Sequence, residues 1–271
     1  GKKQDADYRL AAGDLVELYI NDEFFPAPKE AVKKRRDPLN IIYDDPAIAV
    51  LYKPCHMLCH SDRTGDANLV DLFVEHLKET GEYTPAGGSP FRPAICNRLD
   101  RGTEGLVLAA KTYPALRDAT AIIREGWLHK QYLCIAKGRP PVGIFTAYWK
   151  HDESKNKVFI YRKPTEDRKE IVTGIQVLEE KNGASLCRIT LYTGRTHQIR
   201  AHLAFLGCPI LGDKKYGDME WNSAHPAFTD QALCADQLHF EGIPADNTLF
   251  YLNGTVIALT APSITTKFDK L

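Results

Sequence analysis

The sequence predicts an α+β protein with a mixed, largely antiparallel central sheet and flanking helices and loops. Three observations predict it. Many short segments have the apolar patterns of strands, a few have the spacing of helices, and the two kinds do not alternate as they do around a parallel sheet. The 271 residues, of which 44% are hydrophobic, are enough for one large domain or two small ones.

The first 40 residues are expected to differ from the rest. A turn at Gly13-Asp14 followed by spaced apolar residues predicts a strand within residues 8–20. Residues 26–40 are rich in proline and basic residues and have no apolar period, which is typical of a linker. The basic run at 33–36 is either a solvated tether or an arm that contacts phosphates.

From residue 41 onward, the apolar spacing predicts strands and helices in a mixed order. Two strands, 41–43 and 47–52, flank a turn at Asp44-Asp45-Pro46. Residues 68–79 predict a helix that Asn68 caps, and the apolar run 106–110 predicts a buried strand. Further strands are expected at 131–136, 144–149, 157–161, 171–179 and 184–192, further helices at 113–125 and 196–206, and an Asn-Gly hairpin at 250–259.

The charge is balanced over the whole chain but uneven along it. The net charge is zero, yet residues 188–217 carry five basic residues against one acidic residue, and residues 218–271 carry seven acidic against two basic. A neutral chain can still present a basic face to a polyanion, although such segments can equally be solvated surface. No apolar run approaches the roughly 20 residues of a membrane helix, so we expect no membrane partner.

Seven cysteines are scattered along the chain. Their odd number favours reduced thiols and a cytoplasmic location over a disulfide framework. The stretch KPCHMLCH, residues 53–60, contains two Cys-His pairs and could be half of a zinc site. Structural zinc sites are usually built from two ligand pairs. Because no second cluster with ligand spacing follows, we expect no metal.

Asp100 lies between Arg98 and Arg101, just before the buried run at 106–110. A carboxylate near a core is costly unless it is paired, and an arginine can hold it ionised and oriented. Such a carboxylate suits a nucleophile or a base. The alternative is a turn with a surface ion pair, worth only about 0–1 kcal/mol, and these few residues alone favour the alternative.

Residues 193–217 are a second candidate stretch. Gly194 allows a turn that places Arg195 at the start of a helix, where it can clamp Asp100 across a cleft. His197 and Arg200 can share one helix face, although both can also simply pack or cap the helix. Two further side chains, Lys214 and Lys215, offer charge for phosphate. A third stretch, 129–138, contains Tyr132, which by itself is more often a core residue of a strand.

Together, these stretches resemble the RluA-type RNA pseudouridine synthases. The likeness runs from about residue 41 to 262 and consists of separated motifs in the same order. The motifs are Asn97-Arg98-Leu99-Asp100 with Thr103-Glu104-Gly105, Lys130-Gln131-Tyr132, Gly194 to Gln198, Gly212-Asp213 and Tyr216-Gly217. Departures from the family pattern are Asn97 for a usual His, Glu104 for Ser, and Cys234 near the C-terminal end.

The resemblance implies a domain organisation. Residues 41–271 are expected to form a catalytic domain with the pseudouridine synthase fold. Residues 1–25 are expected to be the remnant of an N-terminal ribosomal-protein-type RNA-binding domain, and residues 26–40 are expected to be the linker between them.

The resemblance also implies a reaction, in which specific uridines of structured RNA are isomerised to pseudouridine without a cofactor or metal. Ribosomal RNA is the expected substrate and transfer RNA the alternative, for a protein expected to be a monomer. Asp100 would attack C1′ or remove the 2′ proton, Arg195 would hold Asp100, and Tyr132 would stack on the base and handle the C5 proton. The expected RNA-binding residues are Arg98, Arg101, His197, Arg200, Lys214 and Lys215.

Two other classes of function compete with this reaction. A non-catalytic RNA-binding protein on the same fold would need the basic residues but not Asp100, Tyr132 and Arg195 together. A hydrolase that attacks a glycosidic bond would normally need a second carboxylate at a defined distance. Glu104 is the nearby candidate for that second carboxylate.

Overall fold

The structure, a computed structural model, describes residues 13, 39–62, 65–85 and 91–271. The described residues from 39 onward belong to a compact unit that begins at Pro38. The strand predicted within 8–20, the remnant predicted at 1–25 and nearly all of the linker predicted at 26–40 lie outside the described residues.

An eleven-stranded sheet organises this unit. Its order is β1-β2-β4-β10-β5-β9-β8-β6-β7, with β11 paired to β10 and β3 paired to β4. Among these strands, β4 and β10 form the one parallel pair, which confirms a mixed, largely antiparallel sheet. The strands are β1 (Asn40–Asp44), β2 (Ile48–Lys53), β3 (Ala94–Ile95), β4 (Glu104–Ala110), β5 (Leu128–Lys137), β6 (Gly143–Asp152), β7 (Lys157–Tyr161), β8 (Lys169–Lys181), β9 (Ala184–Leu191), β10 (Leu233–Phe240) and β11 (Val256–Ala258).

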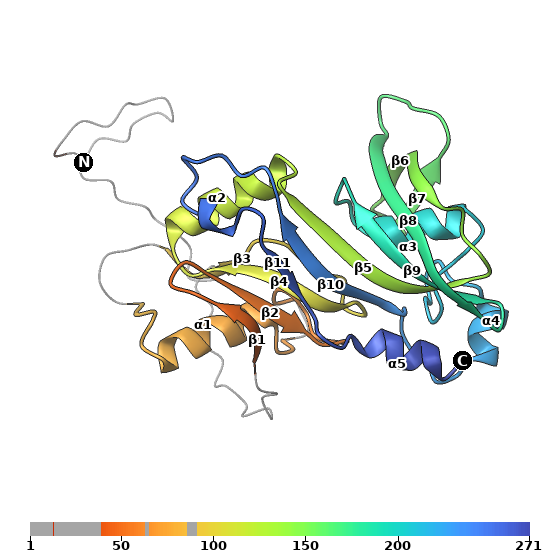
Figure 1. The fold of residues 1–271 in the computed structure, drawn as a ribbon, viewed down its shortest axis with the longest axis horizontal. Helices are drawn as coiled ribbons and strands as arrows, with labels where there is room; N and C mark the ends of the chain where they lie inside the picture. Colours follow the sequence, from red (N-terminus) through yellow and green to blue (C-terminus); the bar gives the residue numbers. More distant parts are fainter. Residues whose placement is uncertain (1–12, 14–38, 63–64, 86–90) are drawn as a thin grey trace. The chain divides into compact units, whose positions relative to one another are not determined.

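Strands β1 to β4 gather at one end of the sheet and β6 to β9 at the other, with β5 and β10 running between them (Figure 1). In the described ranges, five α-helices and one short 3-10 helix accompany the sheet. They are α1 (Leu69–Glu79), α2 (Tyr113–Arg124), α3 (Gln198–Phe205), α4 (Met219–Ala224), α5 (Ser263–Asp269) and the 3-10 helix Phe250–Leu252.

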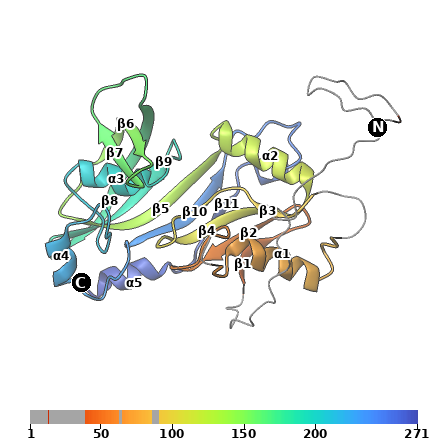
Figure 2. The ribbon, with the colours of Figure 1, turned by 180° about the vertical axis from the view of Figure 1, so that it is seen from behind.

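Helices α1 and α2 cover different faces of the sheet, as the two opposite views show (Figure 1, Figure 2). Asn68 caps α1 as predicted, because its Oδ1 accepts a hydrogen bond from the backbone N–H of Asp71 at 3.0 Å. The apolar stripe of α1 packs into one core cluster and that of α2 into a second. Strand β4 contributes Val107 to the first cluster and Leu108 to the second. A strand that is buried on both faces needs a continuous apolar run, which explains residues 106–110.

Near the C-terminal end, the structure differs from the sequence prediction. The expected hairpin at 250–259 is wrong, because Phe250–Leu252 is a 3-10 helix and β11 pairs with β10. The amide of Ile243 donates to Asn253 Oδ1 at 3.0 Å, so Asn253 holds a longer loop together. Strand β10, a central strand of the sheet, was not predicted at all.

None of the helices in the described ranges is long and apolar enough to cross a membrane. The seven cysteines, all of which lie within the described residues, are free thiols.

Candidate active site

Asp100 lies in the turn between β3 and β4, and buried contacts fix the base of this turn. Leu99 is buried, and its backbone N–H donates to Cys59 Sγ at 3.3 Å, while the Cys59 thiol donates to the Leu99 carbonyl at 3.5 Å. The amide of Thr103 donates to the Asp100 carbonyl at 3.0 Å and closes the turn. The side chain of Asp100 therefore leaves a rigid turn and is 22% exposed.

The arginine that holds Asp100 is Arg200, from helix α3. Its Nη1 donates to Asp100 Oδ2 at 2.8 Å. The predicted pairing of Asp100 with Arg195 is therefore wrong, and Arg195 makes no ion pair with any described residue. The prediction that Arg200 contacts RNA stays a prediction. Its side chain is only 9% exposed and is bonded to two carboxylates.

Asp213, which follows α3, orients Arg200. Its fully buried carboxylate accepts from Arg200 Nε at 2.7 Å and from Nη2 at 2.9 Å, a two-point contact. The backbone N–H groups of Lys215 and Tyr216 also donate to it, at 2.8 and 3.0 Å. Burial alone would raise the pKa of Asp213, but the hydrogen bonds and charge of Arg200 lower it. Burial would likewise lower the pKa of Arg200, and its two carboxylate partners, Asp213 foremost, raise it instead.

The loop that precedes α3 is shaped by the buried side chain of Gln198. Its Oε1 accepts from the Thr193 hydroxyl at 3.0 Å and from the Arg195 amide at 3.1 Å, so the loop curls around it. His197 has a left-handed backbone, with φ 52°, immediately before the helix. Its Nδ1 lies 2.9 Å from the Tyr216 hydroxyl. Burial lowers the pKa of His197 and outweighs the charge of Asp100, so the ring is neutral at pH 7.

A cavity of about 270 Å³ brings the predicted catalytic residues together. Asp100, Tyr132 and Arg195 all line it. Tyr132 comes from β5, where it lies opposite Ala235 of β10. The residue is only 6% exposed, and burial raises the pKa of its phenol, so the hydroxyl keeps its proton. The predicted convergence on one pocket is thus present, with Arg200 in the pairing role given to Arg195.

The predicted RNA-binding residues do not form one surface. Arg98, His197 and Arg200 line the 270 Å³ cavity. Arg101 lines an adjoining cleft of about 550 Å³, which also reaches Asp100, and its Nη2 donates to Asp66 at 2.9 Å. Two further predicted residues, Lys214 and Lys215, line neither space. Lys214 is exposed, and Lys215 donates from Nζ to the Asn156 carbonyl at 2.7 Å.

The sequence interpretation missed two residues of the site, Asp213 and Lys130. Both lie inside quoted motifs, so the signal was present. Lys130, two residues before Tyr132, lines the same cavity, and burial lowers its pKa. Its Nζ lies 3.2 Å from where a Cβ on Gly194 would stand, so the missing side chain at Gly194 makes room for it. Asn97, a departure from the family pattern, accepts from the amide of Leu108 at 2.8 Å and ties the turn to β4.

Glu104 does not serve this cavity. It accepts a hydrogen bond from the Tyr52 hydroxyl at 3.0 Å and faces Lys267, 3.4 Å away. It lines a smaller cavity of about 210 Å³, and neither of the two spaces that Asp100 lines. Glu104 is therefore not placed to act as a second carboxylate with Asp100. Residues that could hold a metal also lie outside this cavity, as described below.

Known proteins resemble this chain in sequence. Residues 47–205 match the family model for RNA pseudouridylate synthase. An uncharacterized RNA pseudouridine synthase of Aquifex aeolicus is 34% identical over 215 residues, which are 77% of this chain and 64% of that protein. The ribosomal large subunit pseudouridine synthase D of Zymomonas mobilis is 32% identical over 226 residues, 79% of this chain and 69% of that protein. This chain thus spans less than two thirds of the length of the Aquifex relative.

A solved structure supports the fold independently. Human RNA pseudouridylate synthase domain containing 4 superposes with a TM-score of 0.64 at 21% identity, covering 84% of this chain and 90% of that chain. The likeness shows the pseudouridine synthase fold that the motifs predicted. The family model and the relatives confirm the family predicted from the motifs, and the chain belongs to the RNA pseudouridylate synthases.

Proposed function

We propose that the protein isomerises specific uridines in structured RNA, with ribosomal RNA as the substrate class, to pseudouridine. One observation carries this proposal. A carboxylate, Asp100, is held by a buried Arg200–Asp213 pair in the same cavity as the phenol of Tyr132. Such a group can act on a sugar carbon while an aromatic ring receives the base.

The proposed reaction only rearranges bonds. The bond between C1′ and N1 breaks, the base turns within the cavity, and C5 bonds to C1′. A proton leaves C5 and N1 ends with a proton, so no atoms are gained or lost. Asp100 Oδ2 accepts from Arg200, whereas Oδ1 accepts no hydrogen bond from a described residue, so Oδ1 is the oxygen left to act. It would either attack C1′ or remove the 2′ proton.

Tyr132 supplies a face for the base and a hydroxyl for the C5 proton. The buried phenol of Tyr132 keeps its own proton. Tyr132 therefore acts as a proton relay, in which the hydroxyl accepts one proton while it passes on another. Lys130 in the same cavity places a nitrogen near this path.

The substrate must present an unstacked nucleotide. Extruding a base from folded RNA costs a few kcal/mol, which contacts with phosphates can offset. Arg98 and Arg195 are exposed at the cavity and are suited to that role. The name of the Zymomonas relative supports ribosomal RNA as the class. We further propose that the protein acts as a monomer in the cytoplasm. Its free thiols favour that compartment.

The competing functions fit the geometry less well. A protein that only binds RNA gains nothing from a buried Arg200–Asp213 pair aimed at Asp100, because buried ion pairs add little net stability. A hydrolase would require a second carboxylate at this cavity, and Glu104 lies elsewhere.

The test is an Asp100→Asn variant, with Asp246→Asn as a matched control at an exposed position. Pseudouridine formed in ribosomal RNA is mapped by carbodiimide labelling, in cells that carry each variant and with purified protein. We expect Asp100→Asn to lose about 10³-fold or more of the activity, while RNA binding stays within about tenfold. Full turnover by Asp100→Asn, or release of free base instead of a product of unchanged mass, would refute the proposal.

A further inference from the structure

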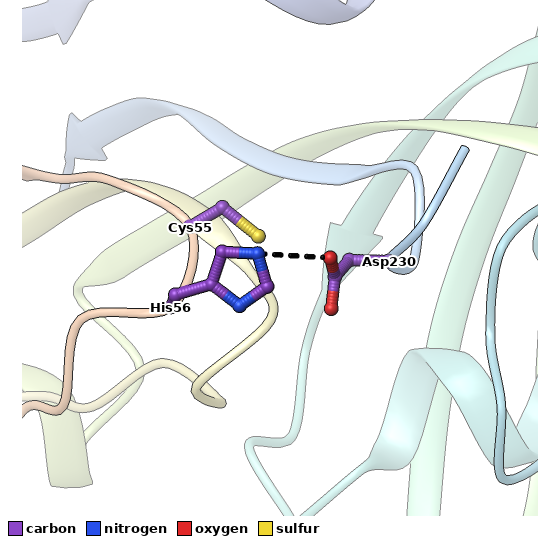
Figure 3. Close-up of side chains that lie close together, drawn as sticks. All are labelled: Cys55, His56 and Asp230. Carbon is purple, nitrogen blue, oxygen red and sulfur yellow. Dashed lines mark ion pairs between the residues drawn. The ribbon is translucent and has the colours of Figure 1, made fainter. Parts of the chain in front are cut away.

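Three metal-ligating side chains from two distant segments meet at the edge of the cleft. Cys55 and His56 follow β2, and Asp230 precedes β10. The ligand atoms of all three lie within 4.8 Å of one another, and His56 Nε2 is 3.1 Å from Asp230 Oδ2. Figure 3 shows the thiol, the ring and the carboxylate turned toward one another. Within the part of the chain that the structure describes, this is the one group of at least three His, Cys, Asp or Glu side chains arranged in this way.

Contacts within the protein hold the loop that carries Cys55 and His56 in place. Lys53 is fully buried, and its Nζ donates to the carbonyls of Pro54 and Met57, both at 2.9 Å. The amide of His56 donates to the Arg101 carbonyl at 2.8 Å. His56 also has φ 68°, in the left-handed region that favours glycine. A residue with a Cβ at such a position is often retained for a functional reason.

The cluster has a protected side and an open side. The side chain of Asp230 is 19% exposed and that of His56 is 67% exposed. All three residues line the 210 Å³ cavity, and His56 and Asp230 also line the 550 Å³ cleft that reaches Asp100. An ordinary ion pair would explain His56 and Asp230, and a thiol hydrogen bond to the Gly102 carbonyl would explain Cys55, but neither contact accounts for the convergence of all three ligand atoms.

We propose that Cys55, His56 and Asp230 form a binding site for a divalent transition-metal ion, with zinc as the best match. One sulfur, one nitrogen and one oxygen suit this borderline ion. Three protein ligands leave a fourth position for water on the open side. Asp100 is not among the ligands, so the site is separate from the proposed isomerisation.

Binding of the metal would release one proton from the thiol. In the structure, the Cys55 thiol donates a hydrogen bond to the Gly102 carbonyl at 3.3 Å. A metal ligand must be the thiolate, so the metal would take the place of this proton.

The sequence pattern alone pointed away from this site. The second Cys-His pair of the KPCHMLCH stretch does not complete the first, because Cys59 is buried against Leu99. The third ligand is Asp230, which comes from a far later segment of the chain. A search for two ligand pairs of regular spacing could not find it.

The test uses the full chain, stripped of metal with a chelator, and titrated with Zn²⁺ and with Co²⁺ as a spectroscopic probe. We expect one Zn²⁺ per chain and a thiolate-to-cobalt charge-transfer band. Cys55→Ser should abolish the band, and Asp230→Asn should weaken binding at least about tenfold. His56→Gly should also weaken binding, and because glycine accepts the left-handed backbone, this variant should fold at least as well.

The matched control is His60→Ala, an exposed histidine of the same segment outside the cluster. It should bind Zn²⁺ like the original protein. The proposal is overturned if no Zn²⁺ binds above background, if Cys55→Ser keeps the cobalt band, or if His60→Ala loses as much affinity as His56→Gly. These readouts do not depend on turnover, so they stand apart from the test of Asp100.

Discussion

At the scale of single residues, the site depends on one guanidinium shared by two carboxylates. Arg200 gives two N–H groups to the buried Asp213 and one to the more exposed Asp100. Buried charges are tolerated only when paired, so Arg200 and Asp213 satisfy each other. Arg200 then presents a fixed donor to Asp100. Asp213 is therefore a positioning residue, which acts on the substrate only through Arg200.

Replacing Arg200 by Lys separates charge from geometry. Lysine keeps the positive charge but cannot contact Asp213 at two points and still reach Asp100. We expect Arg200→Lys to lose about 2–3 kcal/mol of unfolding free energy, the value of one or two charged hydrogen bonds. Turnover should fall roughly a hundredfold, because Asp100 loses its orientation. Urea unfolding and single-turnover kinetics measure the two effects.

Arg195→Lys is the comparison for that variant. The Arg195 side chain is exposed and makes no ion pair with a described residue. The unfolding free energy of Arg195→Lys should therefore differ from that of the original protein by less than about 0.5 kcal/mol. If Arg195→Lys destabilised the protein as much as Arg200→Lys, the assignment of Arg200 as the structural partner would be wrong.

The sequence identified Asp100 and Tyr132 as members of one site but chose the wrong arginine. The choice rested on placing Arg195 at the start of a helix. In the structure, the left-handed backbone of His197 interrupts the helical path, and α3 starts only at Gln198. Arg195 therefore lies outside the helix, where helical spacing does not apply. A single backbone dihedral of this kind cannot be derived from composition or period.

At the scale of secondary-structure elements, the parallel pair β4·β10 places the turn of Asp100. Gly105 of β4 lies beside Ala235 of β10. A Cβ on Gly105 would stand 2.2 Å from the Ala235 carbonyl oxygen, closer than atoms can approach, and φ there is +123°. Strand β10 can therefore pair with β4 at this point only because residue 105 is glycine.

The pairing of β4 with β10 predicts that Gly105→Ala destabilises the protein by more than about 3 kcal/mol. Both the clash of the added Cβ with Ala235 and the backbone strain at residue 105 act on a central strand. Gly126→Ala is the control. Its φ is +80°, but no atom lies within 4 Å of the added Cβ. Only the strain of about 1–2 kcal/mol should appear there. Thermal or urea unfolding compares the two, and equal losses would contradict the close approach of β4 and β10.

Elements with local signals were predictable, whereas those defined by distant partners were not. The cap at Asn68 and the apolar stripe of α1 identified that helix from its own residues. Strand β10 was not predicted, because Asp236 interrupts its apolar run. Asp236 forms an ion pair with Arg188 of β9, in which Arg188 Nη2 lies 3.2 Å from Asp236 Oδ2. Asn253-Gly254 resembled a hairpin turn, but the strand that follows it pairs with β10.

At the scale of the whole described unit, the sheet separates two apolar layers, and some ionisable groups are buried with them. His202 of α3 is 1% exposed, with Nδ1 3.0 Å from the Thr173 hydroxyl oxygen. Burial lowers its pKa from 6.5 to about 4. The folded protein therefore holds this ring neutral at pH values where the unfolded chain protonates it.

This difference makes stability depend on pH between about 6.5 and 4. In that range the unfolded state binds more protons, so the stabilisation is complete above pH 6.5 and is lost as the pH falls through the folded pKa. From these two pKa values, His202 should account for about 2 kcal/mol of lost stability at pH 5 relative to pH 7.5. Urea unfolding at both pH values should show this loss in the original protein and in His60→Gln, an exposed control. His202→Gln should lose about 2 kcal/mol less over this pH range than the original protein, even if that variant starts less stable, because glutamine does not titrate. Any loss from His197, whose pKa burial also lowers, stays in both proteins. An unchanged pH dependence in His202→Gln would show that the ring is not held neutral by burial.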